Sequence, residues 1–151
     1  MAATRFQIRP ATAGDMGAVA GLAAELAQSF TLSRARFEAH YPELLAAGHA
    51  CLLVAPAAPQ DDCLGYLLGF DHLTFYANGR VAWVEELVVR NDHRGQGIGR
   101  ALMNAFEAWA RNRGCALVAL ATRRAAPFYQ ALGYQESAAY LRKLLDDQPA
   151  R

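Results

Sequence analysis

A glycine-rich turn, Arg94-Gly95-Gln96-Gly97-Ile98-Gly99, stands between a strand and a helix and governs the arrangement of the chain around it. The strand before the turn runs from Val81 to Val89. The helix after it carries apolar side chains on one face and ends at Gly114, and Cys115 to Ala121 is then a continuous apolar strand. A strand, a helix and a strand in this order form a βαβ unit, which predicts two parallel strands joined by a right-handed crossover.

The turn has the features of a phosphate-binding site. Its glycines let the backbone approach a ligand closely, and its N–H groups lie at the positive end of the helix dipole, where a pyrophosphate binds well. A dinucleotide fingerprint requires a glycine where Arg100 stands, and a P-loop requires a Gly-Lys-Ser or Gly-Lys-Thr ending that the turn lacks. A tight strand-to-helix connection without a ligand is the alternative that these residues leave open.

The chain before the turn begins with a short strand and two helices. Phe6 to Arg9 alternates apolar and polar side chains, which predicts a first strand. Thr12 to Asp15 reads as a capping box that opens a first helix, whose apolar face extends from Met16 to Phe30. Ser33 is expected to cap a second helix, and Pro42 is expected to kink or split that helix.

Further strands and turns complete a mixed sheet. Cys51–Ala55 and Gly65–Tyr76 read as strands, and Asn78-Gly79 favours a tight antiparallel hairpin into the strand that ends at Val89. A short helix is expected between Pro127 and Gly133, followed by a last hairpin over residues 134–144. The predicted fold is therefore a single α/β domain over residues 1–151, in which helices flank an antiparallel N-terminal half and a parallel strand pair.

Two blocks of sequence carry a family resemblance. The first is Val84-Glu85-Glu86-Leu87-Val88-Val89 and, four residues later, Arg94-Gly95-Gln96-Gly97-Ile98-Gly99-Arg100-Ala101-Leu102. It closely resembles the acetyl-CoA motif of the GNAT superfamily of N-acetyltransferases. The second, Ala125-Ala126-Pro127-Phe128-Tyr129-Gln130-Ala131-Leu132-Gly133-Tyr134, is similar to the A-x-x-F-Y-x-x-L-G-Y segment of that family. The order and separation of the two motifs argue against coincidence.

The resemblance implies that acetyl-CoA binds in a splayed parallel pair formed by Val81–Val89 and Cys115–Ala121. Backbone groups at the end of the first strand would pair with the pantetheine amides, and N–H groups of the glycine-rich turn would hold the pyrophosphate. Thr122 stands where the family often has a cofactor-contacting asparagine, and its hydroxyl can make only part of the hydrogen bonds of an amide. The implied cofactor-binding residues are Leu87, Val88, Val89, Arg94, Gly95, Gln96, Gly97, Ile98, Gly99, Arg100, Thr122 and Phe128.

Acetyl transfer to an amine needs a proton acceptor and a proton donor. A lysine-like ammonium has a pKa near 10.4, so about 3.4 pH units, or roughly 4.6 kcal/mol, separate it from the neutral nucleophile at pH 7. Glu85 and Glu86 are adjacent on a strand and are expected on opposite faces, so that only one shares the face of Trp83 and Leu87. The resemblance implies Glu85 as the general base, with Glu86 as the alternative. It also implies Tyr129 as the acid that protonates the departing thiolate, whereas a packing role is the alternative for that tyrosine.

The sequence constrains the acceptor amine and its pocket less than it constrains the cofactor site. No cysteine lies in either motif, so direct attack in a ternary complex is expected, not a covalent acetyl-enzyme. The expected pocket combines the Phe30–Leu32 turn, the Gly69–Tyr76 stretch and the last hairpin, with Phe30, Trp83 and Glu86 as candidate substrate-binding residues. A polyamine, an amino-acid derivative, an antibiotic amine, and a protein N-terminus or lysine all stay open as acceptors.

Composition argues against several other classes of protein. The hydrophobic fraction of 54% and the charged fraction of 19% are those of an ordinary globular protein, and a net charge of +1 favours neither nucleic acid nor a membrane as partner. The histidines and cysteines lack metal-ligand spacing, so no metal is expected. Three cysteines without a disulfide framework, and no apolar N-terminal stretch, favour a cytoplasmic protein. The resemblance admits a homodimer, and an acetyl-CoA-binding regulatory module without turnover is the alternative to an enzyme.

Overall fold

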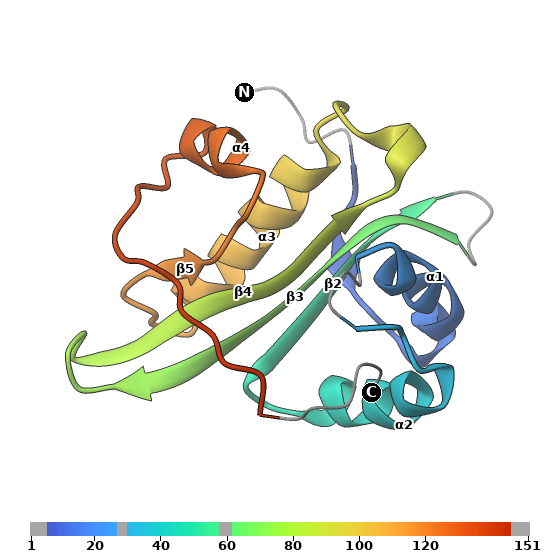
Figure 1. The fold of residues 1–151 in the computed structure, drawn as a ribbon, viewed down its shortest axis with the longest axis horizontal. Helices are drawn as coiled ribbons and strands as arrows, with labels where there is room; N and C mark the ends of the chain where they lie inside the picture. The colour runs from blue at the N-terminus through green and yellow to red at the C-terminus, as the bar shows by residue number, and fades with distance from the viewer. Residues whose placement is uncertain (1–5, 27–29, 58–61, 146–151) are drawn as a thin grey trace.

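The computed structural model describes residues 6–26, 30–57 and 62–145. Within these residues the strands form one five-stranded sheet in the order β1-β2-β3-β4-β5, in which neighbours are antiparallel except for the parallel pair β4–β5 (Figure 1). The strands are β1 (Arg9–Pro10), β2 (Ala50–Ala57), β3 (Asp62–Thr74), β4 (Gly79–Val89) and β5 (Val118–Leu120). The helices are α1 (Met16–Leu26), α2 (Arg34–Ala46), α3 (Ile98–Asn112) and α4 (Ala126–Ala131), with single 3-10 turns at η1 (Ala13–Asp15) and η2 (Asn91–His93). The predicted mixed α/β sheet is confirmed.

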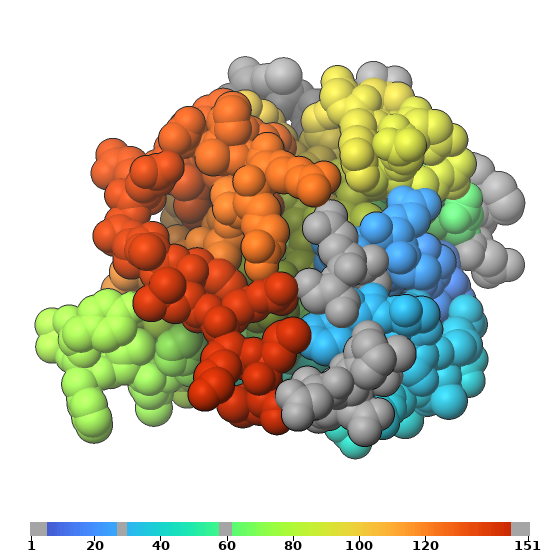
Figure 2. All heavy atoms as spheres, in the orientation of Figure 1, coloured from blue at the N-terminus to red at the C-terminus, as the bar shows by residue number. Residues whose placement is uncertain are grey.

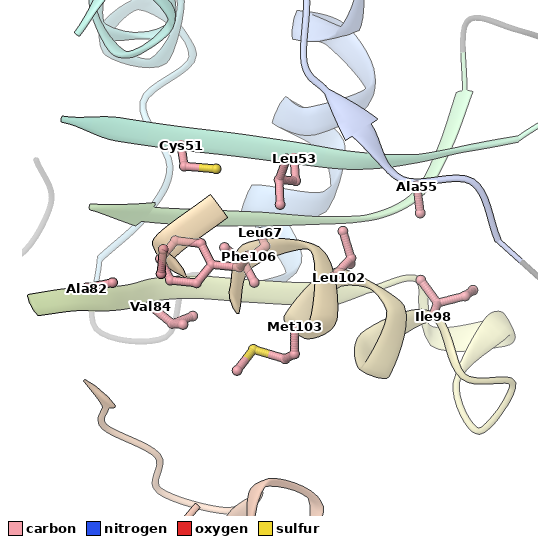
Figure 3. Close-up of a cluster of buried hydrophobic side chains, with 11 residues drawn as sticks. Cys51, Leu53, Ala55, Leu67, Ala82, Val84, Ile98, Leu102, Met103 and Phe106 are labelled. Carbon is pink, nitrogen blue, oxygen red and sulfur yellow. The ribbon is translucent and has the colours of Figure 1, made fainter. Parts of the chain in front are cut away.

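Helices cover both faces of the sheet, and each face has its own core. The core under α3 includes Leu53, Leu67, Val84, Ile98, Leu102, Met103 and Phe106 (Figure 3). The core under α1 and α2 includes Val19, Leu22, Tyr41, Leu52, Val54, Tyr66, Leu68 and Val88. Successive side chains of β2 therefore alternate between two buried faces, which explains why this strand is a continuous apolar run in the sequence.

Strand β4 contains a bulge at Glu85. Leu68 of β3 pairs with Glu86 and Gly69 pairs with Val84, so Glu85 is an extra residue on the β4 side of the ladder. Val84 and Leu87 consequently pack against the same core, under α3, although three positions separate them along the strand. The strict alternation expected from Trp83 to Leu87 is therefore wrong, because the inserted residue resets the period of two.

The parallel ladder between β4 and β5 ends at this bulge. Its pairs are Ala82 with Val118, Trp83 with Ala119, and Val84 with Leu120. From Glu85 to Val89, β4 continues without a described strand paired on its β5 side. The splayed pair that the family resemblance implied is thus present, although β5 is shorter than the predicted strand over residues 115–121.

Local signals in the sequence are confirmed at the turns and caps. Asn78 has a φ of 57° in the turn between β3 and β4, as the Asn-Gly pair predicts. The Thr12 N–H donates to the Asp15 carboxylate at 2.8 Å in the capping box before α1. The Ser33 hydroxyl accepts from the backbone N–H of Arg36 at 3.3 Å and caps α2.

The N-terminal region departs from the sequence prediction at its first strand. The first strand is reduced to Arg9–Pro10, because its partner β2 changes register between Ala55 and Pro56, and the proline has no N–H to offer an extended ladder. Of the two outcomes predicted for Pro42, a split is excluded, because α2 is one helix with the proline inside it. The neighbouring Tyr41 is buried, and its hydroxyl donates to the Thr12 carbonyl at 2.7 Å, which anchors the helix where the proline removes a backbone hydrogen bond.

The C-terminal prediction also fails. The described residues from Tyr134 to Leu145 contain no strand, so the last hairpin is wrong. The edge strand β5 has only three residues, so it offers few backbone groups for a further strand to pair with. Leu141 is 88% exposed and Leu145 is 94% exposed, so these side chains gain no burial that would stabilise a strand. The described part of helix α1 is Met16–Leu26, and Phe30, expected on its apolar face, lies outside the described helices. Among the described residues, no helix combines the length and the apolar character needed to cross a membrane.

Candidate active site

A cleft of about 860 Å³ opens where β4 and β5 separate. Strand β4 forms its floor, beside the segment that leads into α4 (Figure 2). The cleft brings together seven of the predicted site residues, namely Phe30, Trp83, Glu85, Glu86, Leu87, Thr122 and Tyr129. Tyr140 and Arg142 of the C-terminal tail also line it, so the tail contributes to the site without forming the predicted hairpin.

The two adjacent glutamates have different surroundings. Glu85, at the bulge, is exposed, and its carboxylate accepts a hydrogen bond from the Trp83 indole N–H at 2.9 Å. Glu86 is half-buried and accepts a hydrogen bond from the Tyr66 hydroxyl at 2.7 Å. Burial raises the pKa of the Glu86 carboxyl, and the hydrogen bond from Tyr66 opposes part of that rise.

Tyr66 is a residue of the site that the sequence did not reveal. It lies on β3 opposite Val88 and is 1% exposed. Burial raises the pKa of its phenol, and the neighbouring Glu86 raises it further, so the hydroxyl stays protonated and can donate. No sequence motif surrounds Tyr66. Its hydrogen bond to Glu86 depends on the register set by the bulge, which the amino-acid sequence alone does not predict.

Tyr129 enters the cleft from the opposite wall, on α4. Its ring lies edge-on to Phe128, with centroids 4.9 Å apart, and to Tyr134, with centroids 6.0 Å apart. Burial raises the pKa of Tyr129, which keeps its phenol protonated at neutral pH. Among the described residues its hydroxyl has no hydrogen-bond partner, unlike that of Tyr134, which donates to Glu107 at 2.9 Å.

The glycine-rich turn leads into α3 through left-handed backbone. Gly95 has a φ of 77° and Gly97, at the N-cap of α3, has a φ of 94°, so both positions need glycine. The first amides of the helix have no acceptor within the helix, and the residues of the turn before it, from Arg94 to Gly97, are exposed. This arrangement suits the phosphates of an acetyl-CoA molecule.

The other predicted cofactor-binding residues differ in whether their side chains are buried or already hydrogen-bonded within the protein. Ile98 and Val88 are buried in the two cores, so only their backbone groups are available to a ligand. The Arg94 guanidinium folds back and donates to the Val89 carbonyl at 3.3 Å. The Thr122 hydroxyl accepts from the Ala125 N–H at 3.0 Å in the turn before α4, which leaves its proton for a ligand.

A second cavity, of about 430 Å³, lies between helices α1 and α2 and the sheet. Leu26, Phe30 and Glu86 line both this cavity and the larger cleft, so the two meet at the Glu86 side chain. The described residues contain no group of three or more His, Cys, Asp or Glu side chains that could hold a metal ion.

The chain matches known proteins in sequence and in fold. Residues 20–134 match the model of the acetyltransferase (GNAT) family. The thialysine N-epsilon-acetyltransferase of Bos taurus is 34% identical over 145 residues, covering 85% of this chain and 84% of the relative. The glucosamine-6-phosphate N-acetyltransferase of Arabidopsis thaliana superposes with a TM-score of 0.83 at 19% identity, over 95% of this chain and all of that chain. AAC(6')-Iy, solved with the bisubstrate analogue CoA-S-monomethyl-acetylneamine, gives a TM-score of 0.76 at 23% identity, over 93% and 99% of the chains.

Proposed function

This chain belongs to the acetyltransferase (GNAT) family and is an acetyl-transferring enzyme, and from that membership we propose that it acetylates a primary amine with acetyl-CoA by direct attack in a ternary complex. The amine nitrogen forms a bond to the thioester carbonyl carbon, the C–S bond breaks, one amine proton goes to a carboxylate and the departing sulfur receives a proton. The observation that carries the proposal is that one cleft contains glutamates from β4 and, opposite them, the Tyr129 hydroxyl, which has no hydrogen-bond partner among the described residues.

Acetyl-CoA supplies the activated acetyl group, and several parts of this chain fit it. The β4 backbone from Leu87 to Val89 has no described strand beside it on its β5 side, which suits the amides of a pantetheine arm. The exposed amides between Arg94 and Arg100 suit the pyrophosphate. Phe128 packs at Gly99, next to these amides, and Thr122 retains a free donor. These contacts support a cofactor site that runs from the turn to the cleft.

The proton acceptor is a carboxylate of β4. The sequence favoured Glu85 and left Glu86 open, and the surroundings support Glu86 better, because it is half-buried, oriented by Tyr66 and located where the two cavities meet. A carboxyl with a raised pKa is also a stronger base towards an incoming ammonium. Glu85, exposed and bonded to Trp83, is the alternative.

The proton donor in the proposal is Tyr129. Its hydroxyl is protonated, faces the cleft and is not committed to another described residue. Donation from this phenol would stabilise the thiolate as the C–S bond breaks. The Bos taurus relative named above acts, by its name, on thialysine, which supports a small-molecule amine as the acceptor of this chain. A homodimer and a cytoplasmic location stay predictions of the sequence.

The test is thiol release from acetyl-CoA, measured with a panel of primary amines after a thermal-shift screen of acetyl-CoA, NAD and ATP. We expect stabilisation by acetyl-CoA alone and amine-dependent thiol release. Stabilisation without thiol release for any amine would favour the regulatory module, and no stabilisation by acetyl-CoA would overturn the proposal.

A further inference from the structure

The second cavity has a different chemical character at each end. Its inner end carries the Glu86 carboxylate with the Tyr66 hydroxyl, at the junction with the larger cleft. Its outer end carries Arg36 and His40, one turn apart on the exposed side of α2. Most of the remaining lining side chains are apolar, including Val19, Leu26, Phe37, Leu44, Leu52 and Leu68, with Thr31 and Ser33 as further polar ones.

Arg36 is distinguished from its neighbour by what it contacts. The Arg34 guanidinium is bound to Glu38, one turn further along α2, with 2.9 Å between Nε and Oε1. The Arg36 guanidinium has no ion pair or hydrogen bond with any residue in the described part of the chain. A cation at the mouth of an apolar cavity, without an internal counter-ion, attracts an anion on a ligand that enters the cavity.

We propose that the acceptor amine carries an anionic group at the far end of an apolar stem. Its ammonium would bind at Glu86, its stem would lie against the apolar walls, and its anionic group would pair with Arg36, with His40 beside it. The inference rests on the proposed acetyl transfer and specifies its substrate class. A diamine would bring a second positive charge to Arg36, and a simple alkylamine would leave the guanidinium without a partner.

The experiment compares three amines with the same stem: 6-aminohexanoate, hexylamine and 1,6-diaminohexane, with shorter and longer homologues of each. Values of kcat/KM for acetylation and equilibrium binding to the CoA-loaded protein are measured together. We expect the amino acid to exceed the alkylamine by about fivefold, which is the size of an ion pair open to solvent on one side, and to exceed the diamine by more. The advantage should shrink as ionic strength rises, because salt screens an exposed charge pair.

Substitutions at two arginines of the same helix decide the assignment. Arg36→Gln should bring the ratio of amino acid to alkylamine close to one, and Arg36→Glu should invert the preference in favour of the diamine. Arg34→Gln, which removes an equal charge outside the cavity, should keep the ratio of the unchanged protein.

Equal values for the three amines in the unchanged protein, or a ratio that survives Arg36→Gln, would overturn this inference while leaving acetyl transfer intact. An Arg36-dependent binding preference without thiol release would support the site and overturn acetyl transfer.

Discussion

A Cβ atom placed on Gly99 would lie 3.1 Å from Cζ of Phe128, so the first turn of α3 and helix α4 meet at this glycine. The two helices come from separate sequence motifs, and their contact joins the glycine-rich turn to the wall that carries Tyr129. A ligand bound along the turn would therefore be continuous with the catalytic end of the cleft.

Gly97→Val should remove acetyl-CoA binding. The residue has a φ of 94° and open space around a Cβ, so the substitution strains the backbone by roughly 1–2 kcal/mol and alters the amides of the turn. Acetyl-CoA at 100 times its dissociation constant should add about 2.7 kcal/mol to the unchanged protein, a shift of roughly 5–10 °C, and nothing to the variant. Gly114→Val is the matched control, because Gly114 has a φ of 76° at the far end of α3. It should destabilise similarly and keep the shift; equal shifts in all three proteins would contradict the assignment.

Glu86→Gln should lower turnover at pH 7 by roughly 10²–10⁴, because the carboxylate that accepts the ammonium proton is lost while its shape is kept. The deficit should shrink at pH 9.5, where more of the amine arrives neutral. Glu85→Gln should lower turnover by less than about tenfold, since that carboxylate is exposed and bonded to Trp83. A larger loss of turnover in Glu85→Gln than in Glu86→Gln would identify Glu85 as the general base.

Tyr66→Phe should move the acidic limb of the pH profile of kcat/KM to higher pH. The hydrogen bond from Tyr66 lowers the pKa of Glu86, so its removal leaves burial unopposed and raises that pKa further. A base with a higher pKa is still protonated at a pH where the unchanged enzyme is active. Tyr41→Phe is the control, because the Tyr41 hydroxyl bonds to the Thr12 carbonyl instead. A limb that stays in place, or moves to lower pH, would show that Glu86 does not set it.

Tyr129→Phe should reduce kcat and kcat/KM alike by roughly 10²-fold, since the hydrogen bond to the departing sulfur forms only in the transition state. An acetyl donor with a more acidic thiol needs less protonation, so the loss should be smaller with that donor. Tyr134→Phe removes a neighbouring hydroxyl that is bonded to Glu107, and it should not change the dependence on the leaving group. Near-full turnover in Tyr129→Phe, with chemistry rate-limiting, would make the residue a packing tyrosine.

Asp71→Ala should destabilise the fold by about 1.5–3 kcal/mol, measured by urea denaturation. Asp71 is 1% exposed and accepts from Arg113 at 2.6 and 3.1 Å, with Arg80 at 3.4 Å, so the substitution removes charge-assisted hydrogen bonds from two partly exposed arginine side chains. Glu38→Ala removes an exposed partner of Arg34 and should cost no more than about 0.5 kcal/mol. A loss below 1 kcal/mol for Asp71→Ala would mean that the arginines are solvated in its absence.

The sequence predicted those parts of the fold that depend on neighbouring residues. The Asn78-Gly79 turn, the Ser33 cap and the βαβ unit around Gly97 each depend on a few adjacent side chains or on the backbone freedom of glycine. The family motifs added Glu85, Glu86 and Tyr129, which line one cleft.

The sequence failed where distant residues decide the outcome. The β1 strand is cut short by Pro56 on its partner, and residues 134–145 find no edge long enough to pair with. The contact between Glu86 and Tyr66 depends on the bulge at Glu85, which exists only once β3 and β4 are paired. Helical and strand periods describe one element at a time, so they carry no information on these contacts.

The bulge at Glu85 leaves an unprotected edge inside the sheet. Most proteins shield such edges, because unpaired backbone groups invite another polypeptide to add a strand and aggregate. Here the open length of β4 lies at the bottom of a cleft, with α4 on one side and the α1 end on the other, so only a single slender chain can reach it. The end of the β4–β5 ladder at the bulge thus leaves backbone groups of β4 available to the proposed ligand, while the enclosing walls suppress aggregation. Deleting Glu85 should restore a regular ladder between β3 and β4 and close the proposed coenzyme site.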